Sequence, residues 1–122
     1  MIKDLFLVGL GSCVGGILRY LIALAMKQPA TAFPWATFTV NIIGCLFIGV
    51  LWALCSRLPN CSDTVNLLLM VGFCGGFTTF STFSKEGLTL LQSGQYLLFL
   101  LYALGSVVVG LLAVAGGFWL AK

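Results

Sequence analysis

The chain has no histidine, and its cysteines are not spaced as metal ligands usually are. Without imidazole ligands, a His/Cys metal site is excluded. The five cysteines form no Cys-x-x-Cys pair, and three of them, Cys13, Cys45 and Cys74, fall in the middle of long apolar segments. Cysteine behaves there as a small hydrophobic residue, so we expect packing roles and no disulfide.

Acidic residues are also scarce, with only three in the whole chain. Asp4 and Asp63 lie at the edges of apolar segments or in loops, and Glu86 is the one acid clearly inside such a segment. Cation carriers and proton-coupled carriers generally place a carboxylate on the transport pathway, because ionisable residues at membrane depth mark such routes. The shortage of acids therefore disfavours both classes.

What the chain does have is apolar sequence. It is 61% hydrophobic and 7% charged, with a mean hydropathy of +1.15. Four long apolar segments cover residues 5–26, 35–56, 65–91 and 96–121. Each reaches the ~20 residues that cross a bilayer core. We predict an all-α membrane protein with one four-helix domain over residues 1–122 and no soluble domain. The first segment is too long to be a removable signal peptide, and it lacks the basic region before it and the small-residue cleavage site after it.

The third segment contains an unusual interruption. Gly75 and Gly76 stand in its middle, and five hydroxyl residues and three phenylalanines follow within eight positions, as GGFTTFSTFS. Irregular backbone at membrane depth is tolerated only where it is buried in protein or lines a water-filled cavity. We therefore predict a broken third helix, with the break around residues 75–78, that handles something polar within the bilayer.

Two polar side chains lie deep in other segments, and each has two interpretations. Arg19 either extends toward its nearer interface or sits in a water-filled vestibule and attracts anions. Asn41 either hydrogen-bonds a neighbouring helix or offers its NH₂ donors to a passing anion. Hydroxyl donors accompany them at Thr39, Ser81, Thr82 and Ser106. A pathway rich in donors and poor in acids suits a small anion.

Phe80 and Phe83 are three residues apart, so they share one face of a helix. Aromatic rings have a positive edge, and rings presented edge-on can sit beside an anion without repelling it. The alternative is ordinary packing.

Basic residues are balanced between the two sides of the predicted bundle. With four spans, the N-terminus, the second connection and the C-terminus share one side, which holds Lys3, Arg57 and Lys122. The other side holds Lys27, Arg19 and Lys85. A positive bias normally fixes orientation, so this balance indicates either a weak preference or insertion in both orientations. Small residues spaced four apart, such as Gly11 with Gly15, favour tight helix packing and oligomers.

The third-segment motif closely resembles the signature of the Fluc (CrcB-type) fluoride channels. Its full form over residues 75–86 is GGFTTFSTFSKE. Residues 15–20 (GGILRY), residues 39–44 (TVNIIG) and Ser106 also match that family, in the same order along the chain. The resemblance implies an antiparallel, dual-topology homodimer in the bacterial inner membrane, with two fluoride pores and a structural sodium ion at its centre.

The same resemblance implies roles for individual residues. Pore-lining positions would be Asn41, Phe80, Ser81, Thr82, Phe83 and Ser106, with Arg19 near the aqueous entrance. Many members carry a second serine where this chain has Gly110. Carbonyls freed at a helix break suit cations, so the Gly75 and Thr78 backbone oxygens of two subunits are expected to enclose the sodium ion.

Two other classes of function remain as alternatives. A small multidrug-type, proton-coupled exporter would need a carboxylate embedded in the first helix, where only Arg19 and the terminal Asp4 are available. An accessory subunit without a transport role would not explain the broken third helix. We expect a passive channel that is not an enzyme, with fluoride, lipid and a second copy as partners and no nucleic acid.

Overall fold

The computed structural model describes residues 1–58 and 61–122, and within them every regular element is helical. Three long helices are continuous: α1 (Ile2–Ala25), α2 (Trp35–Arg57) and α6 (Tyr96–Ala121). The remaining long rod is made of four consecutive pieces: α3 (Asp63–Val65), the π-helix η1 (Asn66–Cys74), α4 (Gly75–Phe77) and α5 (Ser81–Gln92). The all-α fold with a broken third helix is confirmed.

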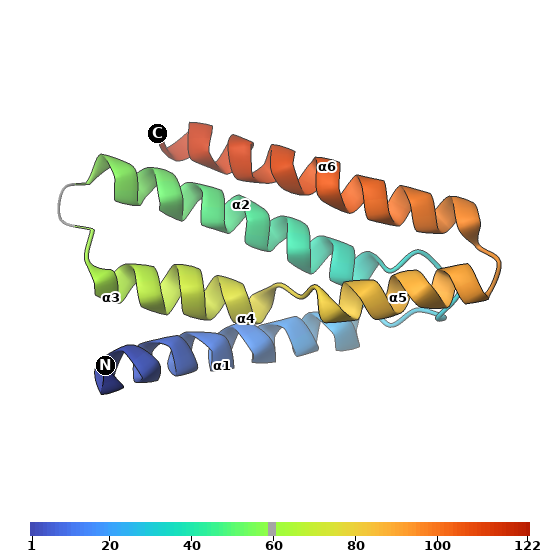
Figure 1. The fold of residues 1–122 in the computed structure, drawn as a ribbon, viewed down its shortest axis with the longest axis horizontal. Coiled ribbons are helices and arrows are strands. Elements are labelled where there is room, and N and C mark those ends of the chain that lie inside the picture. Colours follow the sequence, from blue (N-terminus) through green and yellow to red (C-terminus); the bar gives the residue numbers. More distant parts are fainter. Residues whose placement is uncertain (59–60) are drawn as a thin grey trace.

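The four rods are long and apolar enough to cross a membrane, by length and composition. They run side by side in alternating directions (Figure 1). Both termini, the end of α2 and the start of α3 lie at one end, and the other two connections lie at the opposite end (Figure 1). Large apolar side chains on the outer surface are exposed, as lipid-facing side chains must be, among them Leu97, Leu104 and Leu111.

Glycines bring two pairs of rods into close contact. A Cβ atom at Gly15 of α1 would collide with the Phe73 carbonyl oxygen of η1, and one at Gly11 would collide with the Leu68 carbonyl oxygen. A Cβ atom at Gly49 of α2 would similarly collide with the Val114 carbonyl oxygen of α6. Small residues let helix backbones approach in this way. As a result, α1 packs along η1 and α4, and α2 packs along α6.

The third rod departs from the predicted course in two ways. First, nine residues, Asn66–Cys74, form a π-helix, which widens the helix before the break. Second, Gly75 is helical, with φ −64° and ψ −37°, and the chain becomes extended only at Thr78, with φ −85° and ψ 159°. The break therefore lies at residues 78–80, later than the expected 75–78. Gly76 is instead a packing position, because a Cβ atom there would press on the Ser12 backbone of α1.

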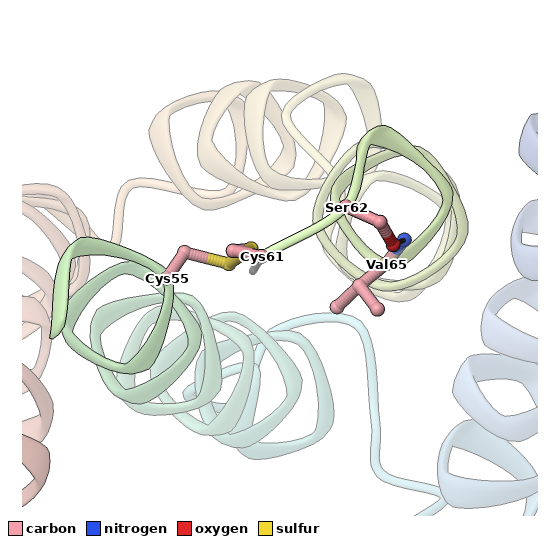
Figure 2. Close-up of a disulfide and its surroundings, with 4 residues drawn as sticks. All are labelled: Cys55, Cys61, Ser62 and Val65. Carbon is pink, nitrogen blue, oxygen red and sulfur yellow. Dashed lines mark hydrogen bonds between the residues drawn. A yellow bond between two sulfur atoms is a disulfide. The ribbon is translucent and has the colours of Figure 1, made fainter. Parts of the chain in front are cut away.

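The expectation of no disulfide is wrong. Cys55 in the last turn of α2 and Cys61 just before α3 are joined by a disulfide, with their Cα atoms 5.0 Å apart (Figure 2). Ser62 follows directly and caps α3, because its hydroxyl accepts a hydrogen bond of 3.3 Å from the Val65 N–H (Figure 2). Cys13, Cys45 and Cys74 are free thiols on the helices, and Cys74 is buried as a packing role requires, whereas Cys13 is exposed.

Candidate functional site

An open cavity of about 660 Å³ lies where the broken rod faces α2 and α6. Six predicted site residues line it: Asn41, Gly75, Thr78, Phe80, Phe83 and Ser106. The rest of the lining is mostly apolar, and no carboxylate belongs to it among the described residues. The structure thus brings most of the predicted site residues together in one place.

The Asn41 side chain makes two hydrogen bonds to the backbone of one residue in the break, Thr79. Its Nδ2 group donates to the Thr79 carbonyl oxygen at 3.0 Å, and its Oδ1 atom accepts from the Thr79 N–H at 2.8 Å. This pair of bonds replaces the intrahelical partners that the Thr79 backbone has lost. Of the two N–H donors of the amide, one remains available to the cavity. The first interpretation, a hydrogen bond to a neighbouring helix segment, is confirmed, and the donation to an anion stays a prediction.

Arg19 reaches the break from the opposite side. Its Nε atom donates to the Gly76 carbonyl oxygen at 3.2 Å, from α1 across to α4. The side chain is half-buried, and Arg19 is not part of the cavity lining. Neither of the two expected roles described this contact. A guanidinium bound to a freed carbonyl stabilises the broken rod directly, and it carries its positive charge next to the break.

Two other carbonyl groups at the break have no hydrogen-bond donor in the described part of the chain, unlike those of Gly76 and Thr79. The Gly75 and Thr78 oxygens accept no hydrogen bond from any described residue, 1–58 or 61–122. In a regular helix the N–H groups four residues later would bond them. The Thr79 N–H instead bonds Asn41, and the Thr82 N–H bonds the Thr79 hydroxyl at 3.2 Å. These are the two oxygens that the sequence assigned to a cation.

The two phenylalanines lie in different surroundings. Phe80 is 78% exposed at the tip of the break, and its ring centroid is 5.9 Å from that of Phe83. Phe83 is half-buried and packs against the Tyr102 ring of α6, with centroids 4.8 Å apart and planes tilted by 52°. Phe83 therefore has an ordinary packing role within one subunit, whereas Phe80 has almost none.

The predicted hydroxyl donors are distributed unevenly. The Ser106 Oγ atom is buried and has no hydrogen-bond partner among the described residues, and its residue lines the cavity. Ser81 is exposed, with its hydroxyl 3.5 Å from that of Thr79. Ser81 and Thr82 begin α5 and do not belong to the cavity lining of the single chain. A buried hydroxyl without a partner is costly, which makes Ser106 the donor most in need of a ligand.

Sequence reasoning missed a polar contact next to the site. The Tyr102 hydroxyl donates to the Glu86 carboxylate at 3.0 Å, joining α6 to α5, and Tyr102 is fully buried. The ring of Tyr102 also contacts Phe83 and, from the α1–α2 connection, Phe33 at 5.4 Å between centroids. An acid inside an apolar segment was visible in the sequence, but nothing in the spacing identified its partner.

Comparison with known proteins identifies the family. Residues 6–118 match the family described as CrcB-like protein, Camphor Resistance (CrcB). The chain belongs to this family. A relative from Phocaeicola vulgatus is 50% identical over 121 residues, covering 98% of this chain and 99% of its own length. Relatives from Flavobacterium psychrophilum, 44% identical over 98% of both chains, and Azobacteroides pseudotrichonymphae, 40% identical over 100% and 98%, are equally complete matches.

All three relatives carry the name Fluoride-specific ion channel FluC. The resemblance that the sequence motifs indicated is therefore confirmed at the level of the family. Together with four helices able to span a bilayer, the match makes this member of the CrcB-like family a multi-pass membrane protein.

Proposed function

We propose that this chain forms a fluoride-selective channel, not an enzyme, that carries fluoride passively out of the bacterial cytoplasm across the inner membrane. The observation that carries the proposal is the cavity at the helix break. Its polar lining supplies N–H and O–H donors from Asn41 and Ser106 and contains no carboxylate among the described residues. Relatives of the same length, at up to 50% identity, are named as fluoride channels.

Fluoride is small and tightly hydrated, so donors must replace its water along the path. Asn41 provides one free N–H while its other bonds hold it in place. The Ser106 hydroxyl, which has no partner among the described residues, provides a second donor. Phe80 and Phe83 present ring edges to the ion, and Ser81 and Thr82 extend the path where the break meets α5. Gly110, beside the Cys45 sulfur, adds no hydroxyl to this path.

The working channel is an antiparallel homodimer of dual topology, with two pores. A single chain leaves the cavity open and Phe80 78% exposed, so the path is not enclosed by one subunit. The balance of basic residues supports insertion in both orientations: Lys3, Arg57 and Lys122 occupy one side, and Lys27, Arg19 and Lys85 the other. Terminal reporters should find both orientations in comparable amounts.

A structural sodium ion fits the break. Its ligands would be the Gly75 and Thr78 carbonyl oxygens, which have no donor among the described residues, from each of two subunits. Neutral oxygens suit a monovalent cation, whereas a divalent ion prefers charged ligands. When bound, the ion supplies positive charge that ties the two breaks together. If the ion is structural, the fluoride reversal potential will not shift when a sodium gradient is imposed.

The proposed function is tested by measuring fluoride efflux from liposomes that contain the purified chain. Fluoride-loaded liposomes should release fluoride, read by an electrode, when potassium and an ionophore clamp the voltage, and chloride-loaded liposomes should not release chloride. A proton-coupled multidrug-type exporter is the competing possibility, and release that required an imposed proton gradient would favour it. The carboxylate that such an exporter would need in its first helix has no good candidate, since Asp4 is exposed beside the terminal amine, 3.9 Å away.

A further inference from the structure

We propose that the Cys55–Cys61 pair is an orientation-dependent modification site: a disulfide in copies whose α2–α3 connection faces the oxidising side of the membrane, and a dithiol in copies whose connection faces the cytoplasm. The inference rests on the dual topology of the proposed function. Its consequence is that two chains of identical sequence become chemically different according to how they are inserted.

The position of the pair supports this inference. Cys55 lies in the last turn of α2 and Cys61 lies just before α3, and the two sulfurs are bonded (Figure 2). Both residues are half-buried, but their neighbours Ser56, Arg57 and Ser62 are exposed. The end of α2 and the start of α3 lie at the end of the bundle with both termini, away from the middle of the spans (Figure 1). A soluble thiol reagent or enzyme can therefore reach the pair from the water on that side.

The chemistry separates the two sides of a bacterial inner membrane. Disulfides persist in oxidising compartments such as the periplasm and are reduced in the cytoplasm. Forming the bond removes two protons and two electrons from the two thiols. The electrons pass by thiol–disulfide exchange to the disulfide of an extracytoplasmic thiol oxidoreductase, which is reduced to its dithiol. On the cytoplasmic side, a reduced dithiol reductant drives the reverse exchange.

The bond also has a local structural effect. It ties the end of α2 to the first turn of α3, where the Ser62 hydroxyl already caps the helix. Nearby, the Arg57 Nη1 atom donates to the Lys122 carbonyl oxygen at 3.4 Å, so this end also contacts the C-terminus. A closed bridge fixes this end of the bundle, and an open one leaves it held by non-covalent contacts alone. In an antiparallel pair, the outward-facing end of one subunit would be bridged and the same end of its partner would not.

The test counts thiols in chains taken directly from the membrane. Cells expressing the full chain are quenched in acid, and the protein is denatured, alkylated with a maleimide and weighed intact. A dithiol chain gains five adducts, and a disulfide chain gains three, on Cys13, Cys45 and Cys74. With both orientations equally populated, about half of the chains should gain three adducts. In Cys55→Ser the two species should merge into one with four adducts, which assigns the bond.

Orientation is then shifted by lysines placed away from the pair. Ile2→Lys with Leu120→Lys adds charge at the end that carries the pair, and should hold it in the cytoplasm and remove the three-adduct species. Thr31→Lys with Gln92→Lys adds charge at the opposite end and should convert nearly all chains to three adducts. Terminal reporters measure the orientation of each variant in parallel.

The outcomes separate the two levels of the proposal. If the reporters find both orientations but every chain has the same number of adducts, the modification site is refuted and the dual topology stands. If the reporters find a single orientation in the unmodified chain, the dual topology fails, and the claim of two chemical forms fails with it.

Discussion

Substitutions of Arg19 can distinguish two roles for this residue: a positive charge that attracts anions, and a hydrogen-bond donor that stabilises the helix break. Arg19→Lys keeps the positive charge but removes the Nε donor that bonds the Gly76 carbonyl oxygen at 3.2 Å. If the contact matters, Arg19→Lys should be impaired. If the charge alone matters, Arg19→Lys should behave like the unmodified chain and Arg19→Gln should not.

The size of the expected effect follows from the type of hydrogen bond. A bond to a charged group contributes about 1.5–3 kcal/mol to stability, and the half-buried position of Arg19 favours the lower value. Since every ~1.4 kcal/mol is a factor of ten in an equilibrium, the loss should lower the equilibrium constant for the correctly broken rod about tenfold. Fluoride flux per assembled channel should fall by up to that factor, and the thermal midpoint in detergent should drop.

The assay compares initial fluoride efflux from liposomes for Arg19→Lys, Arg19→Gln and the control Lys27→Gln. Lys27 is exposed and close to the end of α1, so its replacement removes a charge near the same end of the bundle without touching the break. Unchanged flux and thermal midpoint in Arg19→Lys would refute the argument from the Nε contact. Reduced flux in both glutamine variants, restored equally by lower salt, would favour long-range attraction instead.

Three further predictions concern the cavity. Asn41→Asp keeps the acceptor for the Thr79 N–H but faces the Thr79 carbonyl with a second acceptor, so fluoride flux should be abolished while the protein still assembles; near-normal flux in liposomes would remove Asn41 from the path. Phe80→Ile should slow single-channel conduction severely with little loss of thermal stability, because Phe80 is 78% exposed, whereas Phe83→Ile should lower both. Equal loss of stability in the two variants would indicate that both rings only pack. Tyr102→Phe removes the 3.0 Å bond to Glu86 and should destabilise the fold by about 1–3 kcal/mol, read as a lower thermal midpoint, and an unchanged midpoint would contradict that contact.

Most of the architecture could be predicted because a chain that crosses a membrane can adopt few kinds of backbone structure. Uninterrupted apolar runs in α1, α2 and α6 satisfy their backbone groups only as helices. The π-helix could not be predicted, since Asn66–Cys74 is almost uniformly apolar and its sequence has no period that separates one helix type from another. The disulfide was missed because Cys55 and Cys61 follow no motif spacing. Only the fold brings their Cα atoms to 5.0 Å.

The site was predicted as a set of residues but not as a set of contacts. Glycines indicated where the third rod is special, yet Gly75 stays helical, and the break lies where Asn41 can take over both backbone groups of Thr79. Arg19 was identified as a charge at membrane depth, but its target is a carbonyl oxygen left free by the break itself. Such partners depend on how α1 and α2 lie against the broken rod, and a single sequence does not contain that information.

The π-helix makes the length of one segment unusually strict. Each residue turns an α-helix by about 100°, and a π-helix accommodates an extra residue by widening its turns. Inserting one more residue within Asn66–Cys74, whose turns are already widened, would rotate the break by about that angle. Thr79 would then turn away from Asn41 while α1 still packed on the same rod. The connection around Gly94, by contrast, can change its length without altering that alignment, so insertions should accumulate there and be absent from the π-helix.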